Sequence, residues 1–168
     1  MDTQLILINI LLFLNTYAIV FKVVLIIILL VCSALISGSE VAFFSLTTTD
    51  LKKAISSDNK SLHLIHNLRN NPRRLLAVLL VSNNFINIAI VLLFSSFGDV
   101  LYFDSFPFWV NFIIEVGIIT MIILLFGEIL PKVYANRNPI SFSKRMALPI
   151  QILDKYIFFF LTIPMSKM

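Results

Sequence analysis

The stretch Gly127-Glu128-Ile129-Leu130-Pro131-Lys132 decides how the rest of the chain is interpreted. It ends a nearly uninterrupted apolar run that begins at Phe112, and it brings together a carboxylate, a helix breaker and a cation. A carboxylate at the end of a hydrophobic span is costly to leave unpaired, so it indicates a functional site. In an α-helix, Pro131 cannot donate a hydrogen bond to the carbonyl four residues earlier, which belongs to Gly127. The stretch therefore predicts a bare carbonyl oxygen beside a carboxylate, which is half of a site for a hard cation.

The composition is that of a polytopic membrane protein. Hydrophobic residues make up 59% of the 168-residue chain and charged residues only 13%, and the mean hydropathy is +0.97. These values are too apolar for a soluble domain. Of the 13 Lys and Arg, all but Lys22 fall between Lys52 and Arg74 or between Lys132 and Lys167, beside apolar segments. The net charge of +4 therefore indicates contact with a membrane surface and not with nucleic acid. The one cysteine excludes an intrachain disulfide.

The hydropathy pattern predicts an all-α membrane protein that forms a single transmembrane domain over residues 1–168. Transmembrane helices are expected at about residues 19–44, 72–97 and 108–130, because each segment is apolar and long enough to cross the hydrocarbon core. Residues 4–20 are apolar but carry scattered polar side chains, and we interpret them as a lead-in at the outer interface.

Two further segments are expected to lie against the membrane without crossing it. Residues 47–70 hold two short amphipathic stretches that predict a cytosolic, juxtamembrane helical hairpin, with a cap at Thr47-Thr48-Thr49-Asp50. The tail, 138–168, fits either a fourth span or an interfacial belt helix. Pro149 and Asp154 interrupt its apolar run, so the belt helix is favoured.

The distribution of cations predicts the orientation of the chain. The segment 47–74 is rich in Lys and Arg, whereas the loop 98–107 carries acidic residues and contains no Lys or Arg. Because cytoplasmic loops carry the excess of Lys and Arg, the N-terminus is expected outside and the C-terminus in the cytosol. The sequence thus predicts a multi-pass protein of a cell inner membrane or plasma membrane.

Each predicted span carries polar residues in its cytosolic half. Ser37-Gly38-Ser39-Glu40 is expected to break the first helix, Asn83, Asn84 and Asn87 lie in the second, and Gly127-Glu128 ends the third. Asn83 and Asn87 are four residues apart, so their amides share one helix face. Hydroxyl, amide, carbonyl and carboxylate oxygens suit Mg²⁺, Ca²⁺ or Na⁺ and argue against zinc or copper. Each group alone could simply hold helices together, but three groups at one depth favour a cation site.

These motifs resemble a known family in their order and spacing. Ser37-Gly38-Ser39-Glu40, Asn71-Pro72, Asn83-Asn84-x-x-Asn87 and Gly127-Glu128-x-x-Pro131-Lys132 together are similar to the transmembrane domain of the CNNM/CorB/CorC (cyclin M) magnesium transporter family. The resemblance covers about residues 20–150. It implies three transmembrane helices, a juxtamembrane helical belt, a homodimer, and a magnesium ion bound between the helices in a cavity that opens to the cytosol.

The resemblance also implies which residues hold the ion. The candidate metal ligands are Ser37, Ser39, Asn83, Asn87, Gly127 and Glu128. Of these, Ser39 is expected to lie beside the ion, as are Glu40 and Asn84, which are not counted as ligands. The family normally continues into cytosolic paired CBS modules that bind nucleotide. This sequence stops at Met168, so we interpret it as a truncated or isolated membrane domain that lacks them.

The function expected from these features is magnesium transport across the membrane. Outward direction and sodium as a coupling ion follow only from the resemblance. No nucleophile–base pair and no phosphate-binding loop is recognisable, so we do not expect an enzyme. Two alternatives stay open: a non-transporting magnesium sensor, and a membrane scaffold whose polar residues only pack helices. Glu115, in the middle of the third span, fits equally well an ion path or hydrogen bonding within the bundle.

Overall fold

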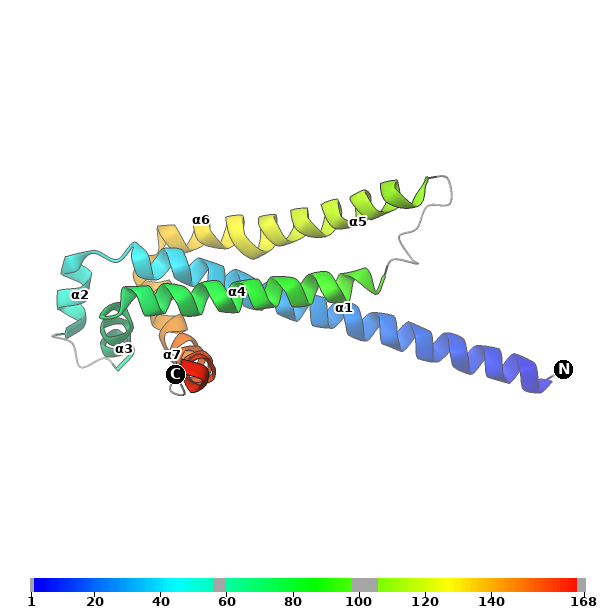
Figure 1. Ribbon diagram of the computed structural model, residues 1–168, viewed down its shortest axis with the longest axis horizontal. Helices are drawn as coiled ribbons and strands as arrows, with labels where there is room; N and C mark the ends of the chain where they lie inside the picture. The colour runs from blue at the N-terminus through cyan, green and yellow to red at the C-terminus, as the bar shows by residue number, and fades with distance from the viewer. Residues whose placement is uncertain (1, 56–59, 98–105, 166–168) are drawn as a thin grey trace.

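The computed structural model describes residues 2–55, 60–97 and 106–165, and within these ranges it contains helices and no strands. Three long helical rods run lengthwise and the shorter helices gather at one end (Figure 1). Within the described part of the chain, three helices are long and apolar enough to cross a membrane, at Asn15–Phe44, Pro72–Ser95 and Phe108–Arg137. The predicted all-α class with three transmembrane helices is therefore confirmed.

The first rod is a single helix, α1 (Asp2–Phe44), which is longer than predicted. Residues 4–20 continue this helix without interruption, and their interpretation as a lead-in at the outer interface stays a prediction. The helix is continuous because the polar residues of this segment are isolated, and neither glycine nor proline occurs before Gly38 to interrupt the backbone hydrogen bonds.

The expected break at Ser37-Gly38-Ser39-Glu40 is also absent, because α1 runs through it. The Ser39 hydroxyl donates a 2.6 Å hydrogen bond to the Leu35 carbonyl, so it is satisfied within its own helix. A Cβ added to Gly38 would lie 2.7 Å from Cζ of Phe142. The small residue thus serves close packing between helices rather than a change of direction.

The second rod is α4 (Pro72–Ser95), which begins with proline in its first turn as the sequence predicts. The third rod is built from α5 (Phe108–Ile122), a π-helical segment η1 (Ile123–Ile129) and α6 (Leu130–Arg137). It extends seven residues beyond the predicted end at Leu130, so Pro131 does not end this rod. Most of the expected outer loop, residues 98–105, lies outside the described residues.

The predicted hairpin corresponds to α2 (Thr48–Ile55) and α3 (Lys60–Arg69), and the turn expected at 56–59 lies outside the described residues. The predicted cap is present: the Asp50 carboxylate accepts bonds from the backbone N–H and the hydroxyl of Thr47, at 3.0 and 2.6 Å, and the Thr47 hydroxyl accepts the Asp50 N–H. This reciprocal arrangement satisfies donors at the start of the helix.

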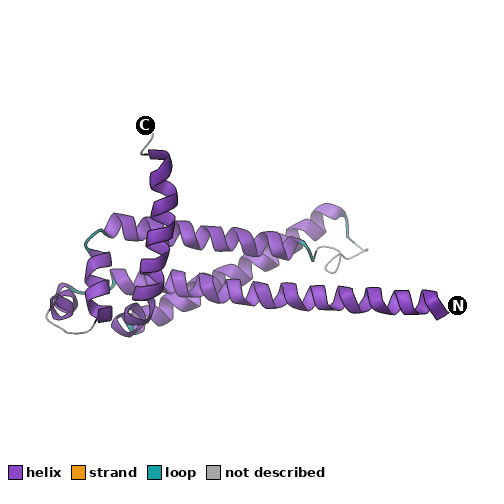
Figure 2. Ribbon diagram, turned by 90° about the horizontal axis from the view of Figure 1, so that it is seen from below, coloured by secondary structure: helices purple, strands orange, loops and turns teal. Residues whose placement is uncertain are grey.

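The tail forms one helix, α7 (Pro139–Met165), which lies across the end of the long rods (Figure 2). It is not among the described helices that could span a membrane. Arg74 clamps it to α4 through two bonds to the Asp154 carboxylate, at 2.7 and 2.8 Å. A buried core at this end joins four helices. Its fully or nearly fully buried members are Ile36, Phe43, Leu46, Ile65, Leu75, Leu79, Met146, Ala147 and Ile150.

Candidate cation site

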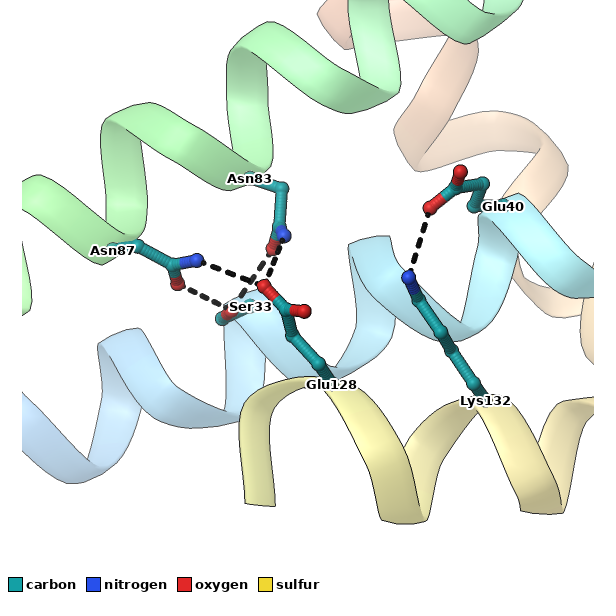
Figure 3. A network of polar contacts seen from close by, with 6 residues as sticks. All are labelled: Ser33, Glu40, Asn83, Asn87, Glu128 and Lys132. Atoms are coloured by element: carbon teal, nitrogen blue, oxygen red, sulfur yellow. Dashed lines mark hydrogen bonds and ion pairs between the residues drawn. The ribbon is translucent and has the colours of Figure 1, made fainter. Parts of the chain in front are cut away.

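Four polar side chains from the three rods converge in the middle of the bundle (Figure 3). The Ser33 hydroxyl on α1 lies 2.9 Å from Oδ1 of Asn83 and 2.8 Å from Oδ1 of Asn87 on α4. The amide nitrogens of both asparagines donate to Oε1 of Glu128 in η1, each at 3.3 Å. The structure therefore brings three of the predicted site residues together: Asn83, Asn87 and Glu128.

The cluster contains more acceptors than its donors can satisfy. The Ser33 hydroxyl has one proton, so it can donate to only one of the two amide oxygens that face it. Turning one amide round would give Ser33 a second partner, but it would aim that amide oxygen at the Glu128 carboxylate. Every arrangement thus leaves two oxygens in contact without a proton between them. A proton on Glu128 or a cation among the oxygens would supply the missing positive charge.

Gly127 borders this cluster and lets α1 approach η1 closely. It is buried, and a Cβ added to it would lie 3.1 Å from the Ser33 hydroxyl oxygen. That spacing is tighter than ordinary van der Waals contact, so a larger residue would push Ser33 away. The structure therefore places Gly127 at the site through its missing side chain.

The π-helical segment around Gly127 and Glu128 was not predicted. Its register is visible at the Leu130 N–H, which bonds to the carbonyl of Leu125, five residues earlier. The expectation that Pro131 leaves the Gly127 carbonyl bare assumed α-helical register, whereas the register at Leu130 is π; that the Gly127 carbonyl is bare stays a prediction. In π register the donor missing from Pro131 would have pointed at Phe126. Single π turns inside helices are frequent at functional sites.

The serines of α1 are placed differently from the prediction. Ser39 is buried and bonded to its own helix, so the structure does not bring it to the cluster. Ser37 lies one turn from Ser33, is 1% exposed, and its hydroxyl has no hydrogen-bond partner among the described residues. The sequence analysis missed Ser33. Its position four residues before Ser37 puts both hydroxyls on one face of α1, and that spacing was the available signal.

The two ends of the site differ in character. On the side toward the N-terminus of α1, a cluster of buried isoleucines from α4, α5 and η1 packs against α1: Ile90, Ile119 and Ile123. On the other side, Nζ of Lys132 lies 3.3 Å from Oε2 of Glu40, and each of these side chains is about one third exposed. Asn84 is exposed and takes no part in the cluster. The site is thus closed by apolar side chains at one end and bordered by a partly hydrated ion pair at the other.

The ligand types available here are hydroxyl, amide and carboxylate oxygens. Across the described ranges, no three His, Cys, Asp or Glu side chains gather in a way that could hold a metal ion. A cation in this bundle would therefore be held mostly by neutral oxygens, with the one formal charge of Glu128. Neutral oxygen ligands and one carboxylate suit a hard cation.

Three helices that are long and apolar enough to cross a membrane, with a partly buried cluster of hydroxyl, amide and carboxylate oxygens between them, define a multi-pass helical membrane protein with a polar site inside its bundle. Comparison with known proteins then identifies the family. Residues 24–168 match the family described as CNNM, the cyclin M transmembrane N-terminal domain, and the chain belongs to that family.

Relatives from bacteria and an animal share this region. The chain is 32% identical over 124 residues to the UPF0053 inner membrane protein YfjD of Escherichia coli (strain K12), a match that covers 72% of this chain and 28% of that protein. It is 31% identical over 131 residues to the metal transporter cnnm-4 of Caenorhabditis elegans, covering 75% of this chain and 27% of the relative. The chain thus spans little more than a quarter of the length of these relatives. The resemblance noted in the sequence is confirmed, and so is a membrane location.

Proposed function

We propose that this protein binds Mg²⁺ between α1, α4 and η1 and carries it across the membrane. The observation that carries the proposal is the Ser33 hydroxyl, which faces two amide oxygens with one proton to offer and lies beside a carboxylate-bearing helix. A relative named as a metal transporter supports a role related to transport of a divalent cation. Magnesium suits the site because it prefers oxygen ligands.

Each residue has a definite part in the proposed site. The oxygens of Ser33, Asn83 and Asn87 already point toward one another, and a cation among them would coordinate the amide oxygen to which Ser33 has no proton to donate. Glu128 supplies the negative charge, and it would exchange its two amide partners for the cation. Ser37 offers a further buried hydroxyl one turn away. Gly127 keeps α1 close enough for these groups to act together.

The arrangement of the two ends supports a cytosol-facing cavity. The Ile90, Ile119 and Ile123 cluster separates the site from the N-terminal end of α1, which the charge distribution predicts to be outside. The ion pair at the opposite end keeps contact with water. Release to the outside would require the isoleucines to separate. We assign outward transport, coupling to sodium, a homodimer, and nucleotide-binding CBS modules in the longer relatives as parts of the same proposal, on the basis of the family.

Two rival functions remain testable against this one. A magnesium sensor would bind the ion without moving it, and a scaffold would use the polar cluster only to pack helices. The experiment is magnesium flux into vesicles that contain the purified protein and a magnesium-sensitive dye. The transporter should give flux that Glu128→Gln abolishes while the variant inserts normally. Binding without flux would favour the sensor, and the absence of both would favour the scaffold.

A further inference from the structure

Lys132 is a cation that follows Glu128 by four residues and pairs with a different carboxylate, that of Glu40. Its ammonium lies 3.3 Å from the Glu40 carboxylate on α1. Figure 3 shows the side chains of Lys132 and Glu128 rising from the same face of the third rod toward α1 and α4. In a regular α-helix residues at this spacing are neighbours, and a glutamate four residues before a lysine is the favourable order for an ion pair. Here the rod passes from the π-helical η1 to α6 between the two residues, and both side chains still lie on one face. Lys132 can therefore form an ion pair with either of two carboxylates, those of Glu40 and Glu128.

The ion pair between Lys132 and Glu40 is expected to be weak. The Glu40 and Lys132 side chains are 35% and 37% exposed, and ion pairs with this much access to water contribute little. Lysine is also a point charge on a flexible stem, so its ammonium can move between partners without a change in the backbone. Glu128, which is also only partly buried, contacts the neutral amides of Asn83 and Asn87 and no cation that the structure shows among the described residues. A carboxylate there is costly to leave without a positive charge nearby.

We propose that Lys132 is an exchangeable counter-cation for Glu128, and that Glu40 controls it. While Glu40 holds the ammonium, Glu128 is available to a metal ion. When the pair opens, the ammonium moves to Glu128, neutralises it and competes with the metal. This inference rests on the proposed function, because it assumes that Mg²⁺ binds at Glu128.

The test is a four-way comparison of Mg²⁺ affinity, measured by titration calorimetry on the purified full chain. Glu40→Gln frees Lys132 and should weaken binding by about two- to fivefold, the range expected of one partly exposed ion pair. Lys132→Met removes the competitor and should bind as tightly as wild type or more tightly. The double variant should match Lys132→Met, because Glu40 has nothing left to control. Lys22→Met is the control: it removes a cation that lies on α1 over the Phe97 ring, away from Glu40, and it should leave the Mg²⁺ affinity unchanged.

Other outcomes separate the alternatives. If the double variant stays as weak as Glu40→Gln, Glu40 acts on the metal itself and the inference is wrong. If Lys132→Met alone weakens binding, the ion pair only braces α1 against α6, and the inference is again wrong. Should Glu40→Gln fail to fold, Glu40→Asp loosens the same pair by one methylene and should shift affinity in the same direction. A wild type without magnesium binding overturns the proposed function and this inference together, whereas wild-type binding that Glu40→Gln leaves unchanged overturns the inference alone.

Discussion

Gly127 lies so close to Ser33 that a Cβ on the glycine would come within 3.1 Å of the serine hydroxyl oxygen. This contact joins the first and third rods at the level where the asparagines of α4 enter the bundle. It explains why the third rod has a glycine in the middle of a π-helical turn, next to the carboxylate of Glu128. The absence of a side chain at Gly127 is thus what allows Ser33, and with it α1, to pack closely against the third rod.

Gly127→Ala should therefore damage the site. The added methyl group has to displace Ser33 or α1, which costs about 1–3 kcal/mol for overpacking in a buried position. We expect a lower melting temperature together with weaker magnesium binding. Gly117→Ala is the matched control, since nothing lies within 4 Å of its added Cβ, and it should be neutral or stabilising by up to about 1 kcal/mol. Equal effects of the two substitutions would show that the close approach is unimportant.

The asparagines of α4 should differ in their effects. Asn83→Ala or Asn87→Ala removes an oxygen that faces Ser33, and we expect a loss of about tenfold in magnesium affinity, or about 1.4 kcal/mol. Asn84→Ala removes an exposed amide from another face of the same helix and should bind normally. Calorimetric titration of the three purified variants, with size-exclusion profiles to verify folding, makes the comparison. Three equal losses would refute the assignment of one ligand-bearing face.

The serines of α1 provide a second matched pair. Ser33→Ala removes the hydroxyl at the centre of the cluster and should weaken magnesium binding. It should also lower stability by about 1 kcal/mol, because the amide oxygen that accepts the Ser33 proton loses its donor. Ser39→Ala removes only a bond to the helix's own backbone and should leave affinity unchanged. Binding and melting temperature measured on the same preparations test both statements. A larger loss of affinity in the Ser39 variant would mean that the site lies nearer the end of α1.

The clamp between α4 and α7 can be tested independently of metal binding. Asp154→Asn removes the charge that Arg74 contacts through two bonds and should destabilise the docking of α7 by about 1 kcal/mol, because the pair is only partly buried. Amide hydrogen exchange should then quicken in α7 before it does in α4. Lys155→Gln changes an exposed neighbour and should leave exchange as in wild type. Unchanged amide exchange in the Asp154→Asn variant would show that the buried core alone holds α7 in place.

The parts of this structure that depend on local pattern were predictable from the sequence. Long apolar runs identified the three spans, because a bilayer demands about 20 apolar residues in a helix. The four-residue spacing of Asn83 and Asn87 was enough to place both amides on one face. The cap at Thr47 and Asp50 followed from residue types that satisfy the donors at a helix start.

The parts that depend on packing between helices were not predictable. The spacing of Ser33 and Ser37 places both hydroxyls on one face of α1, but the contact of Ser33 with the amides of α4 depends on how the two helices pack. The π-helical turn has no local sequence signal, since it is defined by which carbonyl the Leu130 N–H reaches. The motif Ser37-Gly38-Ser39-Glu40 resembles a helix break, but its glycine instead admits the Phe142 ring of α7.

The most direct test of the central claim is the melting temperature of the purified protein as magnesium is added, with potassium at matched ionic strength as the control. Binding to the folded state alone stabilises it by mass action, by about 2.7 kcal/mol when the ion is at 100 times its dissociation constant. The account predicts that magnesium raises the melting temperature of wild type, that potassium does not, and that Glu128→Gln removes the magnesium effect. A wild type indifferent to magnesium, or an equal rise in the Glu128→Gln variant, would contradict it.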